Sequence, residues 1–200
     1  MGLRIEDCGA VILAGGESHR MGTSKPLLRI GGETIAARLA RQFDGFPELW
    51  ISANHPEIAC DLPGQLVQDL YPGLGPLAGL HAALSATELQ FLICVSCDLV
   101  FFSRELAAAM LGAYSGTSLA LACVDSTGRV HPLCGIYAKA ALPVIERRLA
   151  NGQLRMRACL EELRFQPYQI GPRFADVSLS NVNTPEDFAR VLVMKEGEGL

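Results

Sequence analysis

Short apolar runs alternate along the chain with segments whose apolar positions repeat at helical spacing. The runs are rich in β-branched residues and predict strands, whereas the longer periodic segments between them predict helices. The expected strands are Ala10–Leu13, Leu49–Ser52, Leu66–Gln68, Phe91–Val95, Leu119–Val124 and Val130–Tyr137. The expected helices are Thr34–Phe43, Pro76–Ala86, Ser103–Ala113, Ala141–Ala150 and a last helix from Pro185.

The order of these elements predicts the architecture. Strands that are apolar throughout and are separated by helices are typical of a mostly parallel sheet covered on both faces. We therefore expect a single-domain, Rossmann-like α/β three-layer sandwich over residues 1–194. The turn residues from Asp125 to Gly128 directly separate two β runs, so one antiparallel pair is expected there. The Gly- and Glu-rich residues 195–200 are expected to fray.

Composition narrows the classes of protein. Half of the 200 residues are apolar, 19% are charged, and the formal net charge is −4 without a block of basic residues, which argues against a nucleic-acid partner. The start lacks the apolar core of a signal peptide, and no apolar run is long enough to span a membrane. We expect a soluble, cytoplasmic protein. The seven scattered cysteines suit buried thiols better than a disulfide scaffold, and Cys94-x-x-Cys97 is expected to be a pair of core thiols and not a zinc or redox site.

Candidate binding residues follow the ends of the expected strands. Ligands of open α/β sheets bind beyond the carboxyl ends of the strands. At those points the chain has Ala14-Gly15-Gly16, Asn54, Asp69 and Asp98. The sequence therefore predicts a polar site along one edge of the sheet.

The loop from Leu13 to Lys25 is the first candidate. Its three glycines let the backbone approach a phosphate, and Arg20 and Lys25 supply the positive charge that a triphosphate needs. It matches neither the Walker pattern nor the dinucleotide fingerprint. From composition alone, a plain Gly-rich turn with two solvated cations is an equally good interpretation.

Acidic and amide residues supply the remaining chemistry. Asp98 ends an apolar strand, where a carboxylate can hold Mg²⁺, although it can also cap the helix near Ser103. Asp69 precedes a Pro- and Gly-rich turn. From the sequence alone, a turn-forming role explains this residue nearly as well as a role in binding does. Asn181 and Asn183 point the same way if that stretch is extended, so they can bind a metal or a phosphate, or stabilise the loop.

Taken together, several motifs carry a family resemblance. Leu13-Ala14-Gly15-Gly16-x-Ser18-x-Arg20-Met21-Gly22-x-x-Lys25 resembles the signature loop of the molybdenum cofactor guanylyltransferases, the MobA family. The resemblance extends over most of the chain and includes Gly75–Gly79, Cys97-Asp98, His131-Pro132 and Asn181–Asp187.

The resemblance implies a reaction: transfer of GMP from Mg·GTP to the terminal phosphate of molybdopterin, with release of pyrophosphate. It implies catalytic roles for Arg20, Lys25 and Asp98, with Mg²⁺ on Asp98. The nucleotide-binding set is Leu13, Ala14, Gly15, Gly16, Lys25, Ser52, Asp69 and Asp98, and the acceptor-binding set is Gly75, Gly79, His131, Arg155, Asn181 and Asn183. GTP and molybdopterin are the expected partners, with transient contacts to molybdoenzymes or other cofactor-biosynthesis proteins.

Two positions depart from the family pattern. The chain has Ser52 where these enzymes often have Asn, and Leu133 where Thr often follows the His-Pro pair. These departures concern the base and the acceptor. They leave open a cytidylyltransferase that acts on molybdopterin or on a sugar or polyol phosphate. A rival of another class is a non-catalytic nucleotide-binding or cofactor-carrier protein, which the loss of Lys25 or Asp98 would have favoured, but both residues are present.

Overall fold

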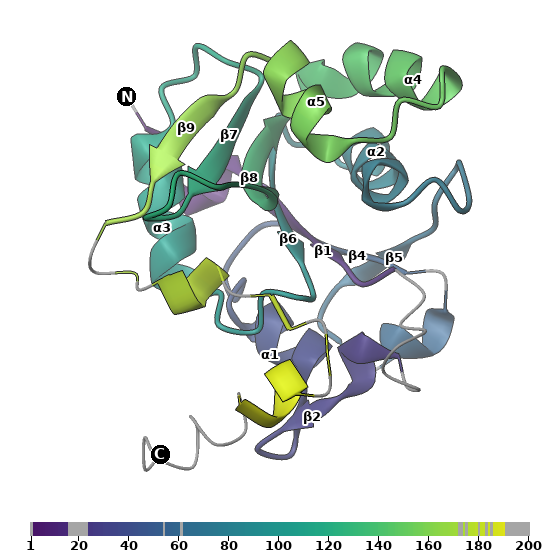
Figure 1. Cartoon of the computed structure of the whole chain (residues 1–200). Helices are drawn as coiled ribbons and strands as arrows, with labels where there is room; N and C mark the ends of the chain where they lie inside the picture. The colour runs from purple at the N-terminus through teal and green to yellow at the C-terminus, as the bar shows by residue number, and fades with distance from the viewer. Residues whose placement is uncertain are drawn as a thin grey trace.

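A seven-stranded sheet forms the centre of the part of the chain that the computed structural model describes (Figure 1). The described residues are 2–15, 24–53, 55–60, 62–171, 174, 176–179, 181–182, 184 and 186–190. In spatial order the strands are β5 (Gln65–Val67), β4 (Leu49–Ser52), β1 (Gly9–Leu13), β6 (Phe91–Ser96), β8 (Val130–Ala138), β7 (Ala120–Val124) and β9 (Gln166–Gln169).

The sheet is mostly parallel, as the sequence predicts. β1 pairs in parallel with β4 and β6, β4 with β5, and β7 with β9. β8 runs antiparallel to both of its neighbours, β6 and β7. The turn between β7 and β8 closes through Gly128 N–H, which donates to the carbonyl of Asp125 at 3.0 Å, so the expected antiparallel pair is confirmed.

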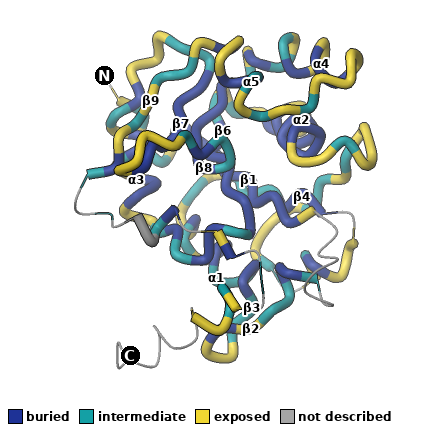
Figure 2. Tube along the Cα trace, in the orientation of Figure 1, coloured by how far each residue is buried: buried dark blue, intermediate teal, exposed yellow. Residues whose placement is uncertain are grey.

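Helices cover both faces of the sheet (Figure 1). α1 (Ile35–Arg41) and α3 (Arg104–Ala113) pack on one face, whereas α2 (Pro76–Ala86), α4 (Leu142–Ala150) and α5 (Met156–Glu162) pack on the other. Successive side chains of a strand point to opposite faces. Ala10 and Ile12 therefore join the cluster under α1 and α3, while Val11 and Leu13 join the cluster under α2. Figure 2 shows the resulting buried interior, and the α/β three-layer fold is confirmed.

Side chains and backbone geometry fix where the helices begin. The Thr34 hydroxyl accepts from Ala37 N–H at 3.1 Å, and the Ser103 hydroxyl accepts from Leu106 N–H at 3.3 Å. α2 begins differently: Gly75 has a φ of 75°, and Pro76 occupies the first turn, where its missing N–H costs nothing. These starts agree with the predicted helices to within a residue or two.

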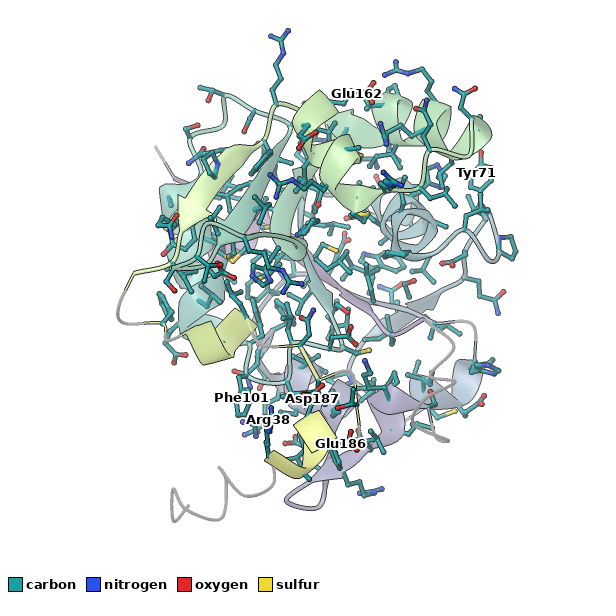
Figure 3. All side chains as sticks on the ribbon, in the orientation of Figure 1. Arg38, Tyr71, Phe101, Glu162, Glu186 and Asp187 are labelled. Atoms are coloured by element: carbon teal, nitrogen blue, oxygen red, sulfur yellow. The ribbon has the colours of Figure 1, made fainter. Side chains whose placement is uncertain are left out.

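The C-terminal helical start is also capped. Residues 186–190 are helical, the Thr184 hydroxyl accepts from Asp187 N–H at 3.1 Å, and the Asp187 carboxylate accepts from Thr184 N–H at 3.0 Å. Figure 3 shows Glu186 and Asp187 in the same region of the view as Arg38. The Nε of Arg38 donates to the carbonyl of Val100 at 3.2 Å. Pro185 and residues 195–200 lie outside the described residues.

Several elements were not predicted. They are α5, the edge strand β9, and a small hairpin of β2 (Arg29–Ile30) and β3 (Glu33–Thr34). Short 3₁₀ helices also occur at Ile5–Asp7, Lys25–Leu27, Pro56–Ile58, Lys139–Ala141 and Asp176–Leu179.

The cysteines are free thiols, and all but Cys60 are buried. Cys94 and Cys97 are both buried, so they are core thiols, as predicted, and burial raises the pKa of each. Among the helices of the described residues, none has the length and apolar character of a membrane span.

Candidate active site

The carboxyl ends of the parallel strands bring the predicted nucleotide residues to one edge. β1 leads into Ala14 and Gly15, and β6 leads into Cys97 and Asp98. Backbone hydrogen bonds continue the pairing beyond the strands: Ala14 N–H donates to the carbonyl of Ser52 at 2.8 Å, and Cys97 N–H donates to the carbonyl of Leu13 at 3.1 Å. Leu13 and Ala14, where the glycine loop starts, are thus held between the strands on either side.

Lys25 and Asp98 form an ion pair at this edge. Lys25 begins the 3₁₀ helix after the glycine loop, and its Nζ lies 2.6 Å from Oδ1 of Asp98, 73 residues away in sequence. The side chains are only 10% and 27% exposed, respectively. Because both charges are partly removed from water, each needs a charged partner, and the pair joins the two residues that were expected to bind phosphate and metal.

The donor set around Asp98 suits a metal that arrives with a substrate. Among the described residues, no group of three or more His, Cys, Asp or Glu side chains could hold a metal ion. Mg²⁺ commonly takes one or two carboxylates from a protein and completes its shell with phosphate and water. One carboxylate just after β6, paired with Lys25, fits that pattern.

Ser52 and Asp69 are hydrogen-bonded to each other. The Ser52 hydroxyl donates to Oδ1 of Asp69 at 3.3 Å, and Ser52 is only 3% exposed. Burial raises the pKa of Asp69, while the hydrogen bond from Ser52 opposes that rise. The buried Ser52 hydroxyl thus donates a hydrogen bond to the Asp69 carboxylate, and Asp69 is the more accessible of these two residues.

The loop after Asp69 is anchored to α2. Leu70 is exposed, and the ring of Tyr71 contacts the ring of His81 with centroids 5.3 Å apart. Gly75, which ends the loop, is exposed and has a positive φ, so a side chain there would strain the backbone.

Gly79 lies where α2 packs closely on the sheet. A Cβ at this position would lie 2.4 Å from the Ser52 Oγ and 3.1 Å from Cδ2 of Leu13. The residue is buried. The absence of a side chain therefore brings α2 against β1 and β4, directly behind the Ser52–Asp69 hydrogen bond.

His131 is held by Asp125, a residue for which the sequence predicts only a place in a turn. Nε2 of His131 lies 2.9 Å from Oδ2 of Asp125, and each residue is 9% exposed. The other oxygen, Oδ1, accepts from Thr127 N–H at 2.9 Å, from the Thr127 hydroxyl at 2.6 Å and from Arg129 N–H at 3.0 Å. The hydrogen bonds from Thr127 and His131 hold the pKa of Asp125 well below its usual range.

A signal for Asp125 is present in the sequence. The residue follows the end of β7, just as Asp69 and Asp98 follow β5 and β6, and all three strands run in the same direction. Asp125 therefore belongs to the same edge.

The structure links the other predicted acceptor residues less directly to the candidate site. Val182 N–H donates to the carbonyl of Asp98 at 3.0 Å, which brings the exposed Asn181 next to the site. Arg155 is exposed and precedes α5, and within the described residues no hydrogen bond or ion pair links it to the others. The remaining candidates, Gly16, Arg20, Asn54 and Asn183, lie outside the described residues.

Comparison with known proteins identifies the family. Residues 10–166 match the family model described as the MobA-like NTP transferase domain. The chain belongs to the MobA-like NTP transferase family. It is 34% identical over 192 residues to a probable molybdenum cofactor guanylyltransferase of Pelotomaculum thermopropionicum, covering 93% of this chain and 92% of that protein. The family resemblance seen in the sequence is thereby confirmed.

Solved structures agree on the fold of this MobA-like transferase. A molybdopterin-guanine dinucleotide biosynthesis protein A from Archaeoglobus fulgidus superposes with a TM-score of 0.81 at 21% identity, covering 94% of this chain and 99% of that one. A 2-C-methyl-D-erythritol 4-phosphate cytidylyltransferase from Thermus thermophilus superposes with a TM-score of 0.70 at 17% identity, covering 94% and 98%. At these identities the likeness shows a shared fold.

Proposed function

We propose that this chain transfers GMP from Mg·GTP to the terminal phosphate of molybdopterin, releasing pyrophosphate and forming a guanine dinucleotide cofactor. The observation that carries the proposal is the 2.6 Å pair of Lys25 and Asp98 beside the glycine loop. It joins a phosphate-binding cation to a carboxylate suited to Mg²⁺ at the ligand edge of a nucleotidyltransferase fold. The name of the Pelotomaculum relative supports the choice of GMP and molybdopterin.

The residues act by positioning and by charge. Backbone N–H groups after Leu13 and the ammonium of Lys25 hold the triphosphate, and Arg20 adds positive charge to the same loop. Asp98 holds Mg²⁺, which when bound neutralises charge on the phosphates. An oxygen of the acceptor's phosphate attacks the α-phosphorus of GTP in line. The bond to the β-phosphate oxygen breaks, and pyrophosphate leaves with its electron pair.

Asp69 is the proposed reader of the base. A carboxylate accepts hydrogen bonds from both N1–H and the exocyclic amine of guanine, whereas cytosine offers no such pair of donors. Ser52 occupies one side of Oδ1 and fixes the orientation of the carboxylate. Gly75, Gly79, His131, Arg155 and the two asparagines form the acceptor side of the proposal. We place the reaction in the cytoplasm, with transient contacts to molybdoenzymes or other cofactor-biosynthesis proteins.

The test is pyrophosphate release from each of the four nucleotides, with and without molybdopterin. Release that requires both GTP and molybdopterin supports the proposal. Release with CTP in place of GTP would instead support a cytidylyltransferase, and nucleotide binding without any release would support a carrier protein. In the Asp69→Ala variant, the ratio of kcat/KM for GTP to that for CTP should fall. If both values fell equally, Asp69 would shape the loop and would not read the base.

A further inference from the structure

Asp125 and His131 form a buried carboxylate–imidazole pair at the same edge as Asp98. β8 is antiparallel to β6 and pairs Cys134 with Val95, so the residues before Cys134 extend past the carboxyl end of β6. β7 runs with β6 and ends at Val124, so Asp125 reaches that edge from the neighbouring strand. The pair therefore lies where the chain leads from β6 into Asp98.

The two oxygens of Asp125 have separate tasks. Oδ1 accepts the three hydrogen bonds of the turn, two from Thr127 and one from Arg129. Oδ2 is thus left for His131. A turn alone needs only the first oxygen, so the bond to His131 is a second function of the same side chain.

The pair fixes the tautomer of His131. An ionised carboxylate only accepts hydrogen bonds, so Nε2 of His131 carries the proton and donates it to Oδ2. Within the described residues, Nδ1 makes no hydrogen bond. His131 keeps 9% of its surface exposed. The nitrogen offered to a ligand is therefore an acceptor.

We propose that Asp125 is a positioning residue that orients His131 so that Nδ1 takes the last proton of the acceptor's phosphate. This inference rests on the proposed function. The O–H bond of a monoprotonated phosphate breaks, its proton moves to Nδ1, and the oxygen keeps the electron pair with which it attacks the α-phosphorus. The imidazolium that forms lies between the phosphate dianion and the Asp125 carboxylate, the same division of roles as in a Ser-His-Asp triad.

Asp125→Asn separates the two tasks. The amide oxygen can keep the hydrogen bonds of the turn, but the amide NH₂ then faces Nε2 and forces the proton onto Nδ1, so Nδ1 no longer accepts. We expect kcat/KM for molybdopterin to fall by about 100-fold, the lower end of what general acid–base catalysis contributes. The KM for GTP should stay within about twofold of the wild type.

A double mutant shows whether Asp125 acts through His131. His131→Gln should cost about as much as Asp125→Asn, and the double variant should be no worse than His131→Gln, because residues that act as a unit are not additive. Thr127→Val is the matched control, since it removes one hydrogen bond to Oδ1 and leaves the bond of Oδ2 to His131 in place. Thermal unfolding of each variant reports any loss of fold.

¹⁵N NMR of the imidazoles, assigned with His131→Gln, gives a readout that is independent of turnover. The wild type should carry its proton on Nε2 of His131 and the Asp125→Asn variant on Nδ1. The proposal is overturned if Asp125→Asn retains the wild-type kcat/KM for molybdopterin, if the two losses multiply, or if Thr127→Val loses as much activity as Asp125→Asn. If the wild type releases no molybdopterin-dependent pyrophosphate, the proposed function fails, while the spectra still decide the orientation of His131.

Discussion

Replacing Gly79 with alanine tests how closely α2 packs against the nucleotide half of the sheet. The added Cβ would lie 2.4 Å from the Ser52 Oγ and 3.1 Å from Cδ2 of Leu13, where ordinary contacts span 3.4–4 Å. Neither neighbour moves freely, because Ser52 and Leu13 are buried in strands. The helix has to shift away from the sheet, and the Ser52–Asp69 hydrogen bond shifts with it.

Two effects of opposite sign set the size of the change. Overpacking of a core costs about 1–3 kcal/mol, and the higher helix propensity of alanine returns about 1 kcal/mol. We expect a net loss of about 0–2 kcal/mol, which lowers Tm by up to roughly 8 °C for a domain of this size.

The assay is thermal unfolding of four variants. Gly112→Ala in α3 is the control, because a Cβ there meets nothing within 4 Å, so its Tm should stay constant or rise. Ser52→Ala removes the atom that clashes, so the double variant Ser52→Ala/Gly79→Ala should be more stable than Gly79→Ala alone. The coupling energy of the two sites should be about 1 kcal/mol, as for residues in contact.

Two outcomes would refute this reasoning. The first is a Gly79→Ala variant as stable as Gly112→Ala, and the second is a clash that Ser52→Ala fails to relieve. A normal Tm combined with a raised KM for the acceptor would point to Gly79 as an acceptor-binding residue, as the family resemblance implies.

Three further substitutions probe the nucleotide side. Asp98→Asn should lower kcat by about 1,000-fold or more with an unchanged far-UV CD spectrum, because the metal loses its carboxylate; near-wild-type turnover in saturating Mg²⁺ would contradict this. Lys25→Ala should weaken GTP binding in calorimetry by about 1.5–3 kcal/mol, the range of charged hydrogen bonds, and an unchanged affinity would place Lys25 outside the triphosphate site. Burial raises the pKa of Asp69 in the folded state. The wild type should therefore be most stable relative to Asp69→Asn below pH 3.8, the usual pKa of Asp. This advantage should be lost as the pH rises through the folded-state pKa of Asp69. Urea unfolding at several pH values measures this difference, and a constant difference would contradict it.

The hydrophobic pattern predicted the buried half of the fold well. β1, β4 and β6 are short apolar runs, and α2 was predicted with its observed bounds because Pro76 marks its start. β9 was missed because Gln166–Gln169 is polar and contains Pro167. That proline is tolerated at the edge of the sheet, where β7 alone among the described strands pairs with β9.

Other elements were too short for periodicity to reveal. β2 and β3 have two residues each, and their turn is formed by Gly31 and Gly32, which both have positive φ. A Gly-Gly pair between two β-prone stretches is a hairpin signal in itself. The turn chemistry thus predicts the hairpin where the strand pattern cannot.

In the candidate site, position along the chain predicted which strand ends share one edge of the sheet, but not which side chains touch. Lys25 and Asp98 were both expected at that edge, and the structure shows that they pair directly. The bond between Asp125 and His131 depends on the reversed direction of β8, which brings the beginning of one strand beside the end of another. A turn fully explains the residues around Asp125, so they do not predict that its carboxylate also binds His131.

The reversed strand also divides the central sheet into two parts. The strands β5, β4, β1 and β6 carry the loops proposed for GTP, whereas the β7–β8 hairpin carries Asp125 and His131, and in the sheet the two parts meet through the pairing of β6 with β8. That pairing is made by backbone groups, so side chains at the tip of the hairpin can be exchanged without moving the strands under the nucleotide. On the proposed assignment, a new acceptor preference can be engineered, or can evolve, at positions of the hairpin tip other than Asp125 and His131, while the groups that bind the triphosphate are kept intact.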